Sequence, residues 1–109
     1  MPQTSMTIRV LFIREGEAWV AQCLEHDIAS QGRTLQEAEA TFGRTFVGQI
    51  MLDVRRGKEP LRGISPAPRM YWRKFKEGIE LKVEPTIPLP KSIPPALVIE
   101  EIRREARVA

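Results

Sequence analysis

The chain has 109 residues, of which 42% are hydrophobic and 28% charged, with a net charge of +3 and a single cysteine. A domain of this size buries roughly two thirds of its unfolded surface, which favours one small cytoplasmic domain over a large enclosed active site. The lone cysteine excludes a disulfide framework, and no apolar run reaches the ~20 residues of a membrane span or resembles a signal peptide.

The positive charge is concentrated in the middle of the chain. Residues 51–78 hold eight basic and three acidic side chains, whereas residues 1–50 hold four basic and six acidic ones. Residues 79–109 hold five of each. A local basic patch attracts phosphate groups or an acidic protein surface, so residues 51–78 indicate either a charged partner or an ordinary solvated surface.

Three strand-like runs open the sequence. Thr7 to Arg14 is rich in β-branched and aromatic residues and carries apolar side chains on both faces, which is typical of a central strand. Trp19 to Leu24 is also strand-like, and the turn Glu15-Gly16-Glu17 between these two runs predicts a β-hairpin. Ile28 to Gln31 predicts a short third strand that Gly32 closes.

A long helix is predicted next. Thr34 and Glu37 match a capping box, in which the Thr34 hydroxyl accepts from the Glu37 N–H and the Glu37 carboxylate accepts from the Thr34 N–H. The run Arg55-Arg56-Gly57 supplies a basic last turn and a stop signal. Gly43 and Gly48 lie inside the helix and indicate close backbone packing. The predicted helix spans residues 34–56, and its core-facing positions are Leu35, Ala38, Phe42, Phe46 and Ile50.

Prolines punctuate the second half of the sequence, where eight of the nine occur. The pair Ser65-Pro66 predicts the start of a short helix that ends at Gly78. On this helix Tyr71 and Phe75 lie one turn apart, and basic residues form a separate stripe. Ile79 to Glu84 then alternates between apolar and charged residues, which predicts a half-exposed strand. The basic stripe comprises Arg69, Arg73 and Lys76.

The remaining residues divide into a connector and a second amphipathic segment. Five prolines between Pro85 and Pro95 predict an extended, polyproline-like connector. From Pro95 to Arg107, acidic residues near the start and basic residues near the end predict a helix with an apolar stripe. Because so short a helix needs a surface to dock on, we expect it to act as an oligomer arm in a homodimer or a dimer of dimers. The alternative is an arm folded back on its own sheet. The stripe comprises Val98, Ile99, Ile102 and Ala106.

These elements predict an α+β fold. A three-stranded antiparallel sheet plus a fourth strand is covered by one long helix, in the order β-β-β-α-[short α]-β. The domain spans residues 6–84 and contains a basic and aromatic insertion at residues 58–78. Residues 85–109 form the Pro-rich connector and the C-terminal amphipathic helix.

The run Trp19 to Leu24, followed by the spacing Gly32-x-Thr34-x-x-Glu37-Ala38, resembles the HicB family of antitoxins. The resemblance covers roughly Met6 to Arg56 well, and Ile79 to Glu84 by topology only. It implies a partial ribonuclease H-like sheet with one face covered by the helix. It also implies a module that neutralises a small RNA-cleaving HicA toxin by binding over the toxin's active site.

Many members of this family add a C-terminal DNA-binding domain. Only 25 residues follow Glu84, beginning with the Pro-rich spacer, which leaves no room for a helix-turn-helix domain. The segment also lacks a ribbon followed by two helices. We therefore do not expect sequence-specific DNA binding.

Chemically reactive side chains are sparse. One cysteine and one histidine in Cys-x-x-His spacing leave a zinc site without its usual complement of ligands. Two-magnesium nuclease chemistry needs carboxylates on neighbouring strands, but the first strand carries Arg9 and Arg14. We expect no catalytic residues, metal or cofactor. The cluster in question comprises Cys23, Glu25, His26 and Asp27, and it reads as a buried cysteine followed by a polar loop.

Two functions of different classes remain open. The first is a non-catalytic, antitoxin-like module that binds a small toxin by steric occlusion. The second is an RNA-binding protein in which cations of the short helix contact phosphates and an aromatic side chain stacks on a base. The residues concerned are Arg69, Arg73, Lys74 and Lys76 for phosphates, with Trp72 or Tyr71 for stacking.

Overall fold

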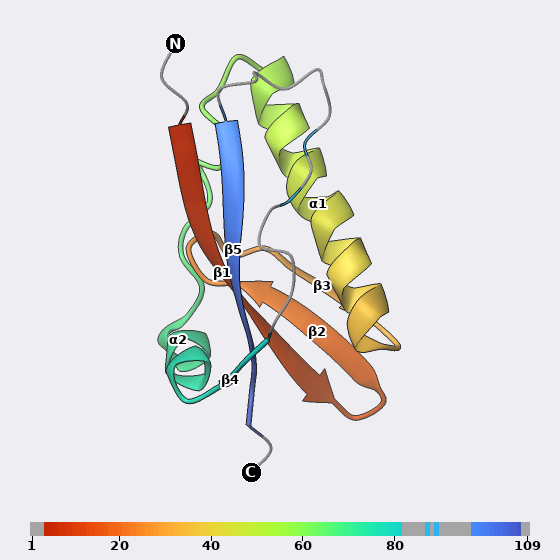
Figure 1. Cartoon of the computed structure of the whole chain (residues 1–109). Coiled ribbons are helices and arrows are strands. Elements are labelled where there is room, and N and C mark those ends of the chain that lie inside the picture. The colour runs from red at the N-terminus through yellow and green to blue at the C-terminus, as the bar shows by residue number, and fades with distance from the viewer. Residues whose placement is uncertain (1–3, 82–86, 88, 90–96, 108–109) are drawn as a thin grey trace.

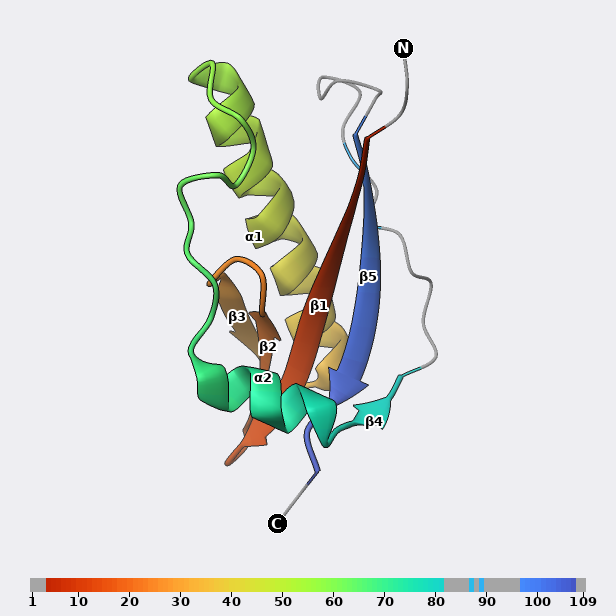
Figure 2. The same ribbon diagram turned by 90° about the vertical axis from the view of Figure 1, so that its left-hand side faces the viewer.

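The structure is a computed structural model that describes residues 4–81, 87, 89 and 97–107 (Figure 1). A five-stranded sheet has the order β3-β2-β1-β5-β4, with one helix on each face (Figure 2). The predicted α+β class is confirmed, but the sheet contains a strand that was not expected. The elements are β1 (Thr4–Glu15), β2 (Ala18–Cys23), β3 (Ala29–Gly32), α1 (Leu35–Arg55), α2 (Arg69–Lys76), β4 (Ile79–Glu80) and β5 (Leu97–Glu105).

Strand β1 is buried on both faces, as its two-sided apolar pattern predicts. Ile8, Val10 and Phe12 belong to the core under α1. Leu11 and Ile13 face the opposite side and belong to the core under α2. This alternation follows from the two-residue period of a strand, so β1 contributes side chains to both hydrophobic cores.

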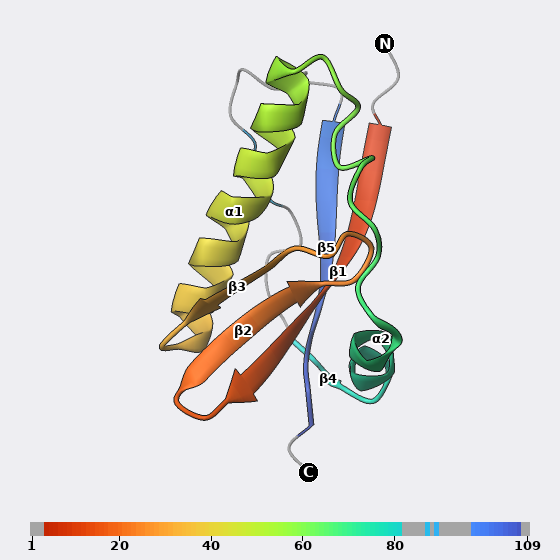
Figure 3. The ribbon, with the colours of Figure 1, turned by 180° about the vertical axis from the view of Figure 1, so that it is seen from behind.

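The predicted hairpin and third strand are present. Strands β1 and β2 pair antiparallel up to Glu15 and Ala18, and Gly16 takes a φ of 63° in the turn between them. A glycine adopts this left-handed conformation without a steric penalty. Strand β3 pairs antiparallel with β2, and α1 packs closely over both (Figure 3).

The C-terminal segment is a strand, so the predicted helix from Pro95 to Arg107 is wrong. Strand β5 lies parallel to β1, in register from Thr4 opposite Leu97 to Phe12 opposite Glu105. The β-branched residues at its start favour a strand, and β1 offers an edge whose backbone groups need partners. An isolated helix of this length is only marginally stable in water, so pairing with β1 stabilises the segment more.

The oligomer arm built on Val98, Ile99 and Ile102 is corrected by the same finding. Ile99 is fully buried in the core under α1, Val98 is half-buried and Ile102 is 40% exposed. The segment folds into the protein's own sheet as a central strand. In this structure the segment therefore takes the alternative placement, folded onto the protein's own sheet.

The predicted strand from Ile79 to Glu84 is described as far as Leu81, and strand β4 covers Ile79–Glu80. Strand β4 pairs antiparallel with the end of β5 at the edge of the sheet, and the Leu81 N–H donates to the Arg103 carbonyl at 3.0 Å. Residues 82–84 lie outside the described residues. So does most of the predicted connector at 85–95, of which Ile87 and Leu89 are described, and the Ile87 N–H donates to the Ile99 carbonyl at 3.2 Å.

Helix α1 matches its prediction in bounds and in buried face. The Thr34 hydroxyl accepts from the Glu37 N–H at 3.0 Å, although no bond returns from the Glu37 carboxylate to the Thr34 N–H among the described contacts. Gly43 and Gly48 do not pack closely within the chain, since a Cβ at either would meet nothing within 4 Å. The expectation of close packing at these glycines is therefore wrong for the described residues. The buried positions are Ala38, Phe42, Phe46 and Ile50.

Candidate functional site

Helix α2 presents the most concentrated basic surface of the described chain. It spans Arg69–Lys76 with Pro68 as N-cap and Glu77 as C-cap, so the predicted start at Ser65-Pro66 is wrong and the predicted end near Gly78 is confirmed. One side of α2 packs on β1 through the buried Phe75, with Tyr71 and Trp72 half-buried beside it. The other side is exposed and holds four cations. We define the α2 basic surface as Arg69, Arg73, Lys74 and Lys76, all of which are exposed.

Trp72 is held by neighbouring groups. Its indole N–H donates to the Ala67 carbonyl at 3.2 Å. The guanidinium of Arg9 lies 5.7 Å from the centre of its ring, within the range of a cation–π contact. Both the polar atom and a face of the indole are thus engaged within the chain, which favours packing over the predicted stacking role.

Arg9 connects this helix to the loop between β2 and β3. Its backbone N–H donates to Glu25 Oε1 at 2.7 Å, and its Nη1 contacts Glu25 Oε2 at 2.5 Å. The Ala67 N–H donates to the Leu24 carbonyl at 2.9 Å just before α2 begins. Because these bonds hold the start of α2 against the loop, the α2 basic surface has a fixed position relative to the sheet.

The C-terminus of α2 is capped by two arginines from the end of the chain. Arg104 Nη1 donates to the Phe75 carbonyl at 3.1 Å, and Arg107 Nε donates to the Glu77 carbonyl at 2.7 Å. Cations at this position complement the unpaired carbonyls of a helix end. The sequence prediction missed both roles because it placed these residues on a helix. The strand period puts Arg104 on the α2 side of β5.

The Cys-x-x-His cluster is a supported loop. Cys23 is fully buried, and burial raises the pKa of its thiol to about 12, so it stays protonated at neutral pH. The backbone N–H groups of His26 and Glu25 bond to the sulfur and oppose that rise, while the Glu25 charge adds to it. The Asp27 carboxylate accepts from Gln22 Nε2 at 2.8 Å. The described residues hold no group of three or more potential metal ligands.

A buried charge cluster under α1 was not predicted. Arg103 on β5 binds Glu39 on α1 at 2.7 Å, and its Nε donates to Glu101 Oε2 at 2.6 Å. Glu101 is 5% exposed, and its Oε1 has no hydrogen-bond partner among the described residues. Burial raises the pKa of Glu101, and the charge of Arg103 opposes that rise. These three residues join α1 to β5 and lie far apart in sequence, which is why no local pattern reveals them.

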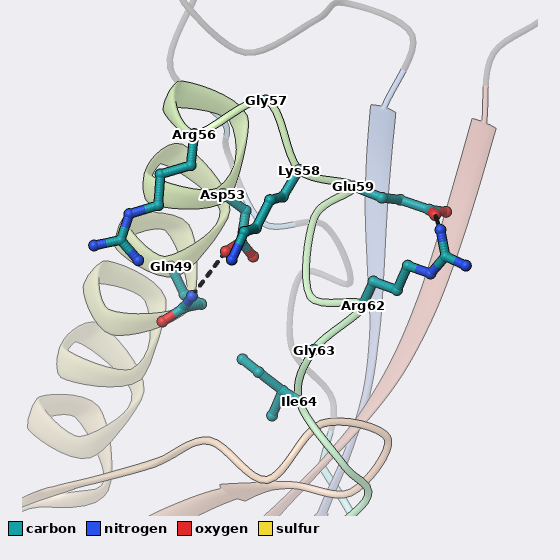
Figure 4. A pocket seen from close by; sticks show the side chains of 9 residues that line it. All are labelled: Gln49, Asp53, Arg56, Gly57, Lys58, Glu59, Arg62, Gly63 and Ile64. Atoms are coloured by element: carbon teal, nitrogen blue, oxygen red, sulfur yellow. Dashed lines mark hydrogen bonds and ion pairs between the residues drawn. The ribbon is translucent and has the colours of Figure 1, made fainter.

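A pocket of about 550 Å³ lies at the C-terminal end of α1 (Figure 4). Asp53 organises it, because its Oδ1 accepts from Gln49 Nε2 at 3.0 Å and its Oδ2 accepts from the Leu61 N–H at 2.8 Å. Leu61 is fully buried and has a φ of 67°, a left-handed conformation that is unusual for this residue type. The rim carries both charge signs, including the Arg62–Glu59 pair at 3.4 Å. We infer that the side chains around this pocket, above all Asp53, hold the loop after α1 in place.

The motif behind the family resemblance forms a structural corner between β3 and α1. A Cβ on Gly32 would lie 2.5 Å from the Ala38 backbone nitrogen and 2.8 Å from the Glu37 carbonyl carbon. Gly32 is therefore required by the close approach of the helix. Ala38 is fully buried directly behind this contact, and Thr34 caps the same first turn. The four motif residues thus position α1 on the sheet.

The comparisons with known proteins identify no relative. No protein-family model matches the chain, and neither a curated protein nor a solved structure matches it. Within the described ranges, no helix is both long and apolar enough to span a membrane.

Proposed function

We propose that this protein is a HicB-like antitoxin that binds a small RNA-cleaving toxin and blocks its active site by steric occlusion. The observation that carries the proposal is the Gly32–Ala38 corner, which seats α1 on the antiparallel hairpin. It supports a partial ribonuclease H-like reading of the first three strands and α1. The resemblance assigned the fourth strand to Ile79–Glu84; in the proposal β5, which lies parallel to β1, takes that place instead.

The α2 basic surface is the part that we propose contacts the toxin. It lies on the opposite sheet face from α1 and is held in place by Arg9 and Arg104. Met70 is 49% exposed on the same helix, and a flexible apolar side chain between cations is a suitable interface anchor. A cationic surface selects an acidic patch on the partner. The antitoxin would therefore block access to the toxin's active site by covering it. A cationic surface cannot mimic the negatively charged phosphates of RNA.

The direct test first asks whether a small toxin-like reading frame lies next to the gene for this protein. The product of that reading frame is then expressed alone and together with the full chain, and growth and RNA cleavage are measured. We expect co-expression to restore growth, and purified chain added at stoichiometric amounts to stop cleavage. Arg73→Glu with Lys76→Glu should weaken this protection, whereas Arg33→Glu on the β3–α1 corner should not. Full toxicity in the presence of the unmodified chain contradicts the proposal.

RNA binding is the second candidate, because four exposed cations occur within one eight-residue helix. With the Trp72 indole engaged by Arg9 and Ala67, such binding would rest on phosphates alone. We expect weak affinity for single-stranded RNA that falls steeply with salt. Fluorescence anisotropy at several salt concentrations measures this slope. Tight binding that is insensitive to salt contradicts a phosphate-only mode.

A further inference from the structure

An apolar groove of about 520 Å³ runs along α1 beside Ile87 and Leu89. Ile87 is buried, whereas Val47, Met51 and Leu89 are half-buried and reach the groove from its two sides. The groove is therefore an apolar surface that the described chain covers only in part. Its helical wall comprises Ala40, Gly43, Arg44, Val47, Gly48 and Met51.

Because the two glycines of this wall have no side chain, they leave a shallow depression on the helix surface. No described residue fills it. A Cβ at Gly43 or Gly48 would meet nothing within 4 Å. Glycine in a helix interior is unfavourable relative to alanine, so its use here weakens α1. What glycine provides in return is room for another backbone to approach closely. The described residues leave that room unused.

The wall is complementary to itself under two-fold rotation. Its six positions are symmetric about the midpoint between Thr45 and Phe46. An antiparallel copy centred there places Ala40 against Met51, a small residue against a large one. It places Gly43 against Gly48, which lets the two helix backbones approach. Large side chains of each copy then lie against small residues of the other, as the packing of helix ridges into grooves requires.

The charges at the two ends of α1 fit the same arrangement. The first turn carries the acidic Glu37 and the last turn carries the basic Arg55, and both side chains are exposed. An antiparallel copy brings Glu37 of one protomer beside Arg55 of the other, twice in one dimer. The same register places Arg44 against Val47 of the second copy, near the centre of the contact. Arg44 bonds Thr41 Oγ1 at 3.2 Å, which draws its guanidinium toward the preceding turn.

We propose that α1 packs antiparallel against α1 of a second copy across this groove and forms a two-fold homodimer. The contact lies on the opposite sheet face from α2, so it leaves the α2 basic surface free in both protomers. The proposal does not depend on the antitoxin assignment. Dimerisation and toxin neutralisation are measured separately, and either can fail while the other holds.

The first experiment measures the mass of the full chain by light scattering across a dilution series. We expect a dimer that dissociates on dilution. The double variant Gly43→Gln, Gly48→Gln should be monomeric at every concentration and should melt at no lower temperature when dilute, since both positions are open within the chain. Thr45→Gln, also exposed but on another side of α1, is the matched control and should stay dimeric.

The second experiment tests the antiparallel direction. Glu37 and Arg55 are 18 residues apart, which separates them by roughly 27 Å along one helix, too far to interact within a protomer. Glu37→Arg and Arg55→Glu should each weaken dimerisation by about three- to tenfold, and the double exchange should restore it. Such recovery can arise only between two copies with opposite helix directions.

Three results overturn the proposal. The unmodified chain is a monomer at every concentration, the glutamine double variant remains a dimer, or the charge exchange shows no recovery. The second result would assign the dimer to another surface, and the third would assign it to a different helix direction.

Discussion

The guanidinium of Arg104 lies 4.8 Å from the centre of the Phe75 ring, and its Nη1 donates to the Phe75 carbonyl oxygen. One side chain of β5 thus covers the aromatic anchor of α2 and caps the same helix. Strand β5, which the sequence analysis predicted to be a helix, therefore holds α2 and its basic surface in place.

Removing this cap should destabilise α2. We expect Arg104→Ala to lower the free energy of unfolding by about 1–2 kcal/mol, from the lost capping bond and cation–π contact. Amide hydrogen exchange should show faster opening of residues 69–76. Arg73→Ala is the control, because its side chain is exposed and makes no bond among the described contacts. Equal effects from the two substitutions would contradict a capping role.

The same substitution at two glycines should have opposite effects. Gly32→Ala pushes a methyl group against the backbone of Glu37 and Ala38 and should cost about 1–3 kcal/mol. Gly43→Ala enters open space in a helix and should stabilise the dilute protein by about 0.5–1 kcal/mol. Urea denaturation of both variants measures this contrast. A neutral Gly32→Ala would show that the corner relaxes freely.

Glu101 should make stability depend on pH. Because burial raises its pKa, the folded protein keeps this proton over a range in which the unfolded chain has released it. Stability is therefore complete below the ordinary glutamate pKa and declines as pH rises through the raised value. Glu101→Gln removes this decline, so its advantage over the unmodified protein should be small in acid and should grow toward neutral pH.

Denaturant unfolding at a series of pH values measures the Glu101 effect. Glu100→Gln is the control, since it makes the same substitution at the neighbouring, exposed side chain. A variant that is less stable at neutral pH would mean that the ion pair with Arg103 outweighs the cost of burial.

Cys23 should be inert in the folded protein. Its pKa of about 12 leaves almost no thiolate at pH 8, and its side chain is fully buried. Iodoacetamide should label it only after denaturant is added, as measured by the mass of the intact protein. Because the folded-state pKa is raised, this thiol should also cost stability as pH rises above its ordinary pKa toward 12. Rapid labelling under native conditions would place Cys23 at an accessible site.

Local patterns predicted the hairpin and α1 because the forces that decide them act within a few residues. The Thr34 cap and the helical spacing of Phe42, Phe46 and Ile50 both lie in one stretch of sequence. The exposed basic stripe of α2 followed from the same helical period. Its anchoring did not, since Arg9 and Arg104 reach α2 from elements distant in the chain.

The segment of β5 could not be assigned from its own residues. Val98, Ile99 and Ile102 suit one face of a helix, while the β-branched start of the segment suits a strand. The deciding partner is β1, at the other end of the described chain, whose edge pairs with nine residues of β5. Glu101 gives no local sign of this choice, because its burial beside Arg103 and Glu39 arises only once β5 lies in the sheet.

The position of β5 also determines when the protein can finish folding during synthesis. It is the last of the described strands to be synthesised, yet it lies between β1 and β4 in the sheet. Until it arrives, a nascent chain that already contains both helices has an open edge along β1 and lacks Ile99 in its main core. Such an intermediate invites mispairing with other chains and attack by proteases. A ribosome that stalls shortly before residue 97 would thus release a product with most of the sequence but without a closed sheet.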